Sequence, residues 1–358
     1  MSRLFDPLVI RSVEIRNRVW AAPMCQYSVE REDGVPVDWH LVNLGGFARG
    51  GAGLVLTEAT AVSPEGRISP QDTGIWNDEQ RDAWARIVAF IRSQGAVPAI
   101  QLAHAGRKAS TFRPWAAQRG TVPPELGGWQ PVAPSAIAFE GYAQPRALET
   151  AELAGVVEAF VAAALRAIAG GFEVLEIHAA HGYLLHEFLS PLSNRRTDAY
   201  GGSLENRARL LLEIVRAVRA EVGEAVPLFV RFSATDWADD GWDETQTAIV
   251  AGWAAEAGAD FFDISAGGLV AHQRITVGPG YQVPLTEHIR AAAEVQASAV
   301  GLITEARQAA EIVDSGRADA VLLARELLRD PNFALRAAGE LGVDVDYWPP
   351  QYLRARPR

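Results

Sequence analysis

The chain has 358 residues, of which 49% are hydrophobic, and its formal net charge is −11. So acidic a chain is a poor candidate for nonspecific nucleic-acid binding, because phosphate contacts need a basic surface. Cys25 is the only cysteine, which excludes internal disulfides and any zinc or iron–sulfur site built from several cysteines.

The sequence contains no segment that we expect to enter a membrane. Its first residues lack the apolar stretch of a signal peptide. The most apolar long window, residues 151–171, carries Glu152, Glu158 and Arg166, which indicates an amphipathic helix. We therefore expect a cytoplasmic protein.

Short apolar runs recur along the chain at intervals that leave room for a helix between them. Before the first run, apolar and polar residues alternate over about residues 4–18, which predicts a short N-terminal hairpin. Continuous apolar strands of this kind are typical of parallel sheets covered on both faces. The predicted strands are residues 18–23, 53–59, 97–102, 172–177, 227–232, 260–265, 298–302 and 319–324.

Helical periodicity fills the intervals, and glycine often follows where a helix should stop, as at Gly95 and Gly170. The predicted helices are residues 78–93, 150–169, 203–222, 243–257, 284–296, 304–315 and 325–338. This alternation predicts an α/β fold, a (β/α)8 TIM barrel, with residues 1–358 forming a single domain.

Two segments lie outside the repeat. A long irregular insertion, about residues 108–147, follows the third strand and is rich in Pro, Gly and Trp. A loop of this length in a compact domain is usually a lid or a binding loop. The C-terminal arm, about residues 341–358, is aromatic and proline-rich and too apolar for a solvated end.

The stretch from Glu176 to Leu185 places His178, His181 and Tyr183 where the fourth strand gives way to a loop. In parallel α/β proteins chemistry is done at this edge of the sheet. Neutral imidazoles can donate N–H bonds to an oxygen that gains negative charge, as an α,β-unsaturated carbonyl oxygen does when hydride reaches the β carbon. Tyr183 is then placed to protonate the α carbon.

Two alternatives remain open for the histidine pair on the residues alone. His178 and His181 could bind a metal, with His186 or Glu187 as the third ligand, in a metal-dependent TIM-barrel hydrolase or lyase. Either histidine could also be structural, held by hydrogen bonds in the loop.

Four segments in this order resemble the old yellow enzyme family: residues 22–27, 101–108, 178–183 and 196–207. The resemblance covers nearly the whole chain and is strongest to the bacterial thermophilic-like class, which has a cysteine near the flavin. It implies a TIM barrel that binds FMN noncovalently, takes hydride from NADPH or NADH, and reduces the activated C=C bonds of α,β-unsaturated carbonyl or nitro compounds. No bound metal is expected. A non-catalytic flavin-binding sensor is the remaining alternative.

The resemblance also assigns the flavin site. Arg231, at the end of an apolar strand, would face the flavin N1, or else form a structural ion pair with Glu176 or Glu58. Gln101 would bond the pyrimidine ring, or else lie in a buried loop hydrogen bond. The predicted FMN-binding residues are Ala22, Pro23, Met24, Cys25, Ala59, Gln101, Arg231, Gly301, Ala324, Arg325 and Arg354.

Within that set, Gly301, Ala324 and Arg325 follow strands seven and eight, where barrels usually hold phosphate groups. Many relatives carry glycine where this chain has Ala324. Cys25 would tune the flavin, although a buried inert thiol is the alternative.

The same resemblance implies a substrate mouth and a shared subunit site. Tyr27 resembles a tyrosine that caps the substrate carbonyl, and Lys108 and Trp115 open the insertion and would line the mouth, unless Lys108 is a solvated charge. Arg354 resembles an arginine that reaches the flavin site of a neighbouring subunit. We therefore expect a homodimer or homotetramer, with an exposed tail as the alternative.

Overall fold

The computed structural model describes residues 2–356, and its centre is a closed barrel of parallel strands. In barrel order these are β3 (Val19–Ala21), β4 (Leu54–Ala61), β5 (Val97–Ala103), β8 (Val174–Ala179), β9 (Leu228–Ser233), β10 (Phe261–Ser265), β11 (Ala297–Ala299) and β12 (Ala320–Leu323). β12 pairs with β3 and closes the ring. The predicted (β/α)8 barrel is thereby confirmed.

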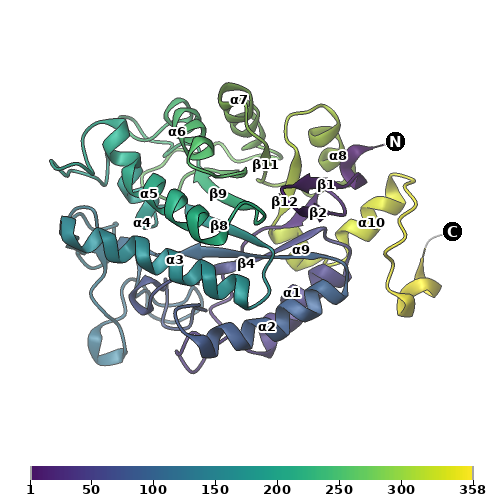
Figure 1. Cartoon of the computed structure of the whole chain (residues 1–358), viewed down its shortest axis with the longest axis horizontal. Helices are drawn as coiled ribbons and strands as arrows, with labels where there is room; N and C mark the ends of the chain where they lie inside the picture. Colours follow the sequence, from purple (N-terminus) through teal and green to yellow (C-terminus); the bar gives the residue numbers. More distant parts are fainter. Residues whose placement is uncertain (1, 357–358) are drawn as a thin grey trace.

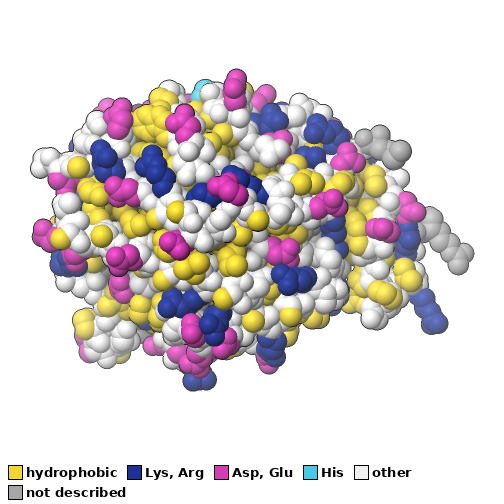
Figure 2. Space-filling model, viewed as in Figure 1, with side chains coloured by type: hydrophobic (Ala, Val, Ile, Leu, Met, Phe, Trp, Pro, Cys, Tyr) yellow, Lys and Arg dark blue, Asp and Glu magenta, His cyan; other side chains and the backbone are white. Residues whose placement is uncertain are grey.

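Helices surround the barrel (Figure 1). They are α1 (Asp38–Arg49), α2 (Asp78–Ser93), α3 (Leu153–Ala169), α4 (Leu184–Leu189), α5 (Leu204–Val222), α6 (Glu244–Glu256), α7 (Val283–Ala293), α8 (Ala306–Asp314), α9 (Arg325–Arg329) and α10 (Phe333–Glu340). Within residues 2–356, none of them is both long and apolar enough to cross a membrane. Acidic and basic side chains are interspersed over the face in Figure 2.

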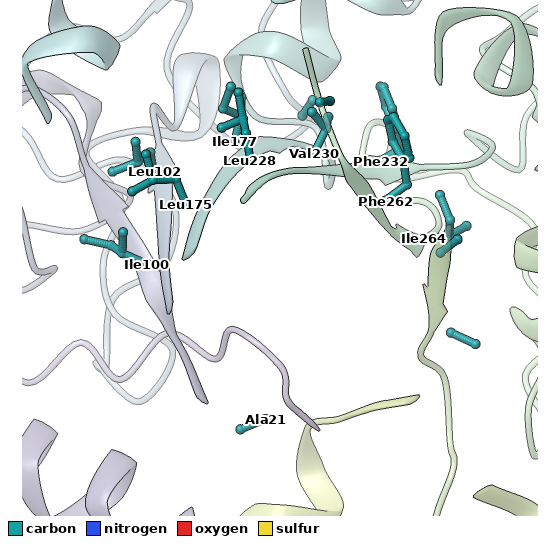
Figure 3. Packing of buried hydrophobic residues seen from close by; sticks show 14 of the residues in the cluster. Ala21, Ile100, Leu102, Leu175, Ile177, Leu228, Val230, Phe232, Phe262 and Ile264 are labelled. Carbon is teal, nitrogen blue, oxygen red and sulfur yellow. The ribbon is translucent and has the colours of Figure 1, made fainter. Parts of the chain in front are cut away.

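Alternate residues of the strands pack into two separate cores. Side chains such as Ile100, Ile177 and Phe232 point outward from the barrel toward the helices (Figure 3). Trp20, Phe229 and others of the opposite face form a second cluster, and the two rings lie 6.0 Å apart. The strands are therefore buried on both faces, as their continuous apolar sequences require.

The N-terminal hairpin belongs to the inner of these cores. β1 (Leu8–Ile10) pairs antiparallel with β2 (Val13–Ile15), and their buried side chains join the cluster of Trp20 and Phe229. Apolar side chains thus fill the barrel interior at the amino ends of the strands, and polar side chains are left to the carboxyl ends.

Three features differ from the sequence-based expectation, and one of them is the short helix α4, which was not predicted. α1 was not predicted, because Gly45 and Gly46 inside it are poor helix formers. A Cβ on Gly45 would lie 2.6 Å from the ring of Phe90, so close packing against α2 is the reason for glycine there. The single helix expected over 325–338 is instead two, because Pro331 lacks the N–H that a continuous helix needs.

The insertion and the arm have little regular structure. Between β5 and α3 the chain forms only single turns and the two-residue strands β6 (Val132–Ala133) and β7 (Arg146–Ala147). The C-terminal segment lies beside α10, where Val345 and Tyr347 pack against Leu335 (Figure 1).

Gly50 tests how closely the barrel's outer helices pack. A Cβ at Gly50 would lie 1.7 Å from the carbonyl oxygen of Pro331, whereas one at Gly252, inside α6, would meet nothing within 4 Å. We expect Gly50→Ala to destabilise the fold by about 1–3 kcal/mol through overpacking. Gly252→Ala should be neutral or stabilising by up to about 1 kcal/mol. Thermal denaturation of both variants measures this, and equal melting temperatures would contradict it.

Candidate functional site

Polar side chains replace apolar ones near the carboxyl end of the barrel. β8, β9 and β10 place His178, Arg231 and Asp263 level with one another across the sheet. β5 and β8 likewise pair Gln101 with Glu176. All of these residues are at most 5% exposed. The fold therefore gathers five hydrogen-bonding side chains in one mouth, shielded from bulk water.

An ion pair fixes the arginine of this group. Arg231 Nε lies 2.7 Å from Asp263 Oδ2, and both side chains are buried. The partners anticipated for a structural ion pair, Glu176 and Glu58, are not the ones used, and Glu58 instead lies 3.2 Å from His40 Nε2. Asp263 takes this place because β9 and β10 are neighbours in register.

The mouth keeps unused hydrogen-bonding capacity. Gln101 Nε2 donates to Glu176 Oε1 at 2.8 Å, while Glu176 Oε2 is buried without a partner. Burial, with a smaller contribution from nearby Asp263, raises the pKa of Glu176 to about 8. Neither Nη atom of Arg231 donates to another residue in the described part of the chain. Such groups suit a ligand with a planar edge that carries both donors and acceptors.

His178 also belongs to a second cluster, which it forms with His181 and Tyr183. The His178 ring lies 5.2 Å from that of His181 and 5.1 Å from that of Tyr183, edge-on to both. The Nδ1 of His178 accepts a hydrogen bond from the Ala180 N–H at 3.3 Å. A neutral His178 therefore carries its proton on Nε2.

Burial sets the protonation state of all three groups. It lowers the pKa of both His178 and His181 well below the usual value, and the charge of Arg231 adds to the effect. It raises the pKa of Tyr183 well above its usual value. The site thus holds two neutral imidazoles and an intact phenol, which can all act as donors.

His181 is held from several sides. It has a left-handed backbone (φ 59°), which a non-glycine residue adopts only where its surroundings enforce it. Its N–H donates to Ser233 Oγ at 2.9 Å, and its Nε2 lies 2.8 Å from Ser265 Oγ. Lys108 Nζ donates to its carbonyl at 2.9 Å and also to that of Gly268. Lys108 is therefore not a solvated charge, and burial lowers its pKa to about 8.

His186 and Glu187, the two residues considered as the third ligand of a metal, contact other protein groups. His186 Nδ1 accepts from the Gly182 N–H at 2.9 Å, and its Nε2 lies 3.0 Å from Asp236 Oδ1. Glu187 Oε1 accepts from the Arg107 N–H at 2.8 Å. Among residues 2–356, no three His, Cys, Asp or Glu side chains are arranged to hold a metal ion. The geometry gives the metal alternative no support.

Cys25 and Tyr27 lie in the same part of the site as Tyr183. Together with Tyr183 they pack against a small apolar cluster that includes Ala59. Trp115, which is 59% exposed, lies edge-on to Tyr27 with ring centres 5.9 Å apart. Burial, reinforced by nearby carboxylates, raises the pKa of Cys25 well above its usual value, so it remains a thiol.

The segment before Cys25 is tied to the barrel. The Ala22 N–H donates to the Leu323 carbonyl of β12 at 3.0 Å, and Met24 packs against the main core. Pro23 and Met24 are only partly buried. The segment 22–25 therefore runs along the carboxyl end of β3 with part of its surface accessible.

A separate cleft of about 100 Å³ lies after β11 and β12, lined by Gly301, Thr304, Ala324 and Arg325 among others. Gly301 has a φ of 117°, and a Cβ there would lie 2.7 Å from Gln282 Nε2. Arg325 is exposed, and its guanidinium forms no ion pair within residues 2–356. The cleft thus combines backbone that can be closely approached with an available cation.

Arg354 lies apart from these groups within the chain. It belongs to the short helical segment Pro350–Ala355 and is exposed. The arm that leads to it is anchored near the amino end of β3, where the Asn17 Nδ2 donates to the Tyr347 hydroxyl at 3.0 Å.

Sequence reasoning did not identify Asp263, Ser233 or Ser265 as parts of the site. Each is a polar residue within or at the end of an otherwise apolar strand, the same signal that drew attention to Arg231. The signal was present, but only strand pairing shows which of these side chains meet.

The chain resembles known proteins over nearly its whole length. Residues 3–343 match the family described as the NADH:flavin oxidoreductase / NADH oxidase family. The NADPH dehydrogenase of Bacillus velezensis is 46% identical over 354 residues, which cover 99% of each chain. Morphinone reductase superposes with a TM-score of 0.78 at 32% identity, covering 98% of this chain and 92% of that one. The old yellow enzyme homologue from Zymomonas mobilis has a TM-score of 0.78 at 29% identity, covering 99% of both chains.

Glu187 should make stability depend on pH. Burial raises its pKa to about 8, so the folded state holds its proton more tightly than the unfolded chain does. The resulting stabilisation is complete below the unfolded pKa and is lost as pH rises through the folded one. We expect the wild type to lose up to about 2 kcal/mol more than Glu187→Gln between pH 6 and pH 8.

Melting temperatures across this pH range measure the difference. Glu140→Gln, which alters an exposed carboxyl on the insertion, is the matched control and should follow the wild type. The assignment is wrong if Glu187→Gln shows the same alkaline loss as the wild type.

Proposed function

The chain belongs to the NADH:flavin oxidoreductase / NADH oxidase family, that of the old yellow enzymes, and we propose that it reduces the activated C=C bonds of α,β-unsaturated carbonyl or nitro compounds. It is an FMN-dependent oxidoreductase that takes hydride from a reduced nicotinamide dinucleotide. The observation that carries the proposal is the pair of neutral imidazoles, with His178 buried and His181 half-buried, beside an intact phenol.

The polar mouth supports the binding of FMN. Gln101 and Arg231 would hold the polar edge of its ring, because the Nη atoms of Arg231 have no partner within residues 2–356 and its charge opposes negative charge at that edge. Residues 22–25 and Ala59 would line the ring, with Cys25 present as a thiol. When bound, FMN supplies a ring that accepts and returns a hydride.

The cleft after β11 and β12 supports the placement of the phosphate group. Gly301 and Ala324 would present backbone N–H groups, and Arg325 would complement the charge. The methyl group of Ala324 need not block its backbone N–H. The deviation from the glycine of many relatives is therefore compatible with this role.

His178 and His181 would bind the substrate oxygen. As the β carbon receives hydride, that oxygen gains negative charge, and two N–H donors stabilise it more strongly than the neutral ground state. The similar structure morphinone reductase is named for the reduction of a ketone, which is consistent with such a substrate.

Tyr183 would supply the proton to the α carbon. Its hydroxyl keeps its proton because burial raises its pKa, and no residue in the described part of the chain hydrogen-bonds to it. Tyr27 and Trp115, whose rings contact each other, would cover the substrate. Lys108 would shape the substrate-binding opening indirectly, because it donates hydrogen bonds to the loops of His181 and Gly268.

The arm supports a shared site in a homodimer or homotetramer. Arg354 is exposed and far along an apolar tail, so it is available to the flavin site of a neighbouring subunit rather than to its own. Exposed apolar side chains on α1 and α9, Trp39, Val42 and Leu328, line a groove on which a second copy could pack.

Anaerobic reoxidation tests the proposed function. The FMN-loaded protein, reduced with NADPH in the absence of oxygen, should regain its oxidised flavin spectrum when cyclohexenone is added. A maleimide and a nitroalkene should do the same. The proposal is wrong if NADPH reduces the protein but none of these alkenes reoxidises it.

Tyr183→Phe tests the source of the proton. Loss of a general acid typically lowers a rate by about 10²–10⁴-fold, so reoxidation by cyclohexenone should slow by at least that lower bound. Reduction by NADPH needs no such proton and should be unchanged. Stopped-flow absorbance separates the two steps, and Tyr200→Phe, whose hydroxyl bonds Glu213, is the control. An unchanged reoxidation rate would mean that water delivers the proton.

A further inference from the structure

A cavity of about 460 Å³ lies between the insertion and α3. It is separate from the mouth of the barrel, since none of Gln101, His178, Tyr183 or Arg231 lines it. We propose that it is a second ligand site, which takes a neutral molecule with an apolar body and a carbonyl oxygen that accepts a hydrogen bond from His104. The proposal does not depend on the proposed function of the mouth.

The size and the wall of the cavity suit a small molecule better than water. Val132, Leu148, Val156 and Ala159 line it and belong to the main hydrophobic core or pack against it. Water gains few hydrogen bonds against such a wall, whereas an apolar ring is stabilised by leaving water. Ligand sites typically enclose about 300–1,000 Å³ and combine apolar walls with a few polar groups.

His104 supplies the polar group. It lines the cavity and is 5% exposed. Its Nδ1 accepts a hydrogen bond from the Gly106 N–H at 3.1 Å, so the neutral ring carries its proton on Nε2. No acceptor within residues 2–356 bonds to this Nε2–H, and leaving such a buried donor unpaired is unfavourable. The missing partner is an oxygen atom that enters the cavity.

The His104 ring is held in one place for this contact. A Cβ on Gly66 would lie 3.2 Å from His104 Cδ2, so the ring packs closely against that turn. The His104 carbonyl accepts the Leu184 N–H at 3.0 Å, directly after Tyr183. A ligand on His104 would therefore contact the residue that also holds the loop of Tyr183.

The charges around the cavity favour a neutral ligand over an anion. Arg146 is not available to an anion, because its two terminal nitrogens donate to Glu152 at 2.7 and 2.8 Å. Glu65 adds a further negative charge to the lining. Burial lowers the pKa of His104 to about 4, although Glu65 acts in the opposite direction, so the ring is uncharged at neutral pH. A carbonyl oxygen without formal charge fits these conditions.

NMR titration of the FMN-loaded protein with 4-fluorobenzamide tests the site. The probe has an apolar ring and one neutral carbonyl group. With histidine labelled, the ring signals of the seven histidines can be followed, and that of His104 is identified by its loss in His104→Leu. We expect a saturable shift of the His104 signal. 4-Fluorobenzoate, which has the same shape and a negative charge, should bind His104 at least about ten-fold more weakly.

Two substitutions of His104 isolate the Nε2–H donor. Both His104→Gln and His104→Leu remove the acceptor of the Gly106 N–H, but only glutamine keeps an N–H group that can reach the probe. Loss of one hydrogen bond should make binding to His104→Leu up to about ten-fold weaker than binding to His104→Gln. The ¹⁹F signal of the probe measures both affinities.

Gly155→Trp tests the cavity without disturbing His104. Gly155 lines the cavity from α3, and a Cβ there would meet nothing within 4 Å, so a larger side chain can enter without a clash. We expect it to occupy part of the space and to weaken the probe by about ten-fold or more. Gly252→Trp, at an equally open position in α6, is the matched control and should bind like the wild type.

The results have clear consequences for the proposal. It is overturned if the His104 signal shows no saturable shift, or if the benzoate binds as well as the benzamide. Equal affinities in Gly155→Trp and Gly252→Trp also overturn it, because a probe bound in the barrel mouth would not be affected by either. These two variants and the wild-type titration decide the matter even if the His104 variants do not fold.

Discussion

The ion pair between Arg231 and Asp263 is the interaction on which the mouth of the barrel depends. Both charges are buried, and an unpaired charge in such a place would be destabilising by several kcal/mol. Strand register settles the pairing, because β9 and β10 are neighbours and their polar residues lie level. Asp263 approaches the guanidinium from its Nε side, so the two Nη groups remain available. The carboxylate thus neutralises the charge that burial penalises and at the same time orients the face that a ligand meets.

Exclusion of water then sets the protonation states of His178, His181 and Tyr183. The same burial acts in opposite directions on bases and acids: it lowers the pKa of His178 and His181 and raises that of Tyr183. Each group is therefore kept in its neutral form, and each neutral form has a proton to donate. Arg231 strengthens the effect on the imidazoles because a cation disfavours a second cation nearby. The three donors have one cause in common. A site that is shielded from water and holds one fixed cation keeps each of them in its neutral form.

The barrel could be predicted from the sequence because its signals are local. Apolar runs and glycine stops mark the strands and most helices without any knowledge of pairing. The helix α1 was not predicted, because Gly45 lowers its helix propensity. Close contact with Phe90 requires this glycine, and helix propensity carries no information about such a contact. The clustering of His178, His181 and Tyr183 was predictable because they are near in sequence and follow one strand. The partner of Arg231 was not, since Asp263 is distant in the chain and the acidic residues considered, Glu176 and Glu58, were equally plausible on composition.

Close backbone contact joins the loops that follow β8 and β10. A Cβ on Gly182 would lie 2.3 Å from the Gly268 carbonyl oxygen, so the loops after β8 and β10 touch with no side chain between them. This contact allows Ser265, at the end of β10, to reach the ring of His181. Behind Ser265 lies Gln282, which also contacts the backbone at the cleft after β11. A side chain at either glycine would separate the loops and break this chain of contacts, although neither glycine takes part in chemistry. The placement of the His181 ring therefore depends on loop packing as much as on its own hydrogen bonds.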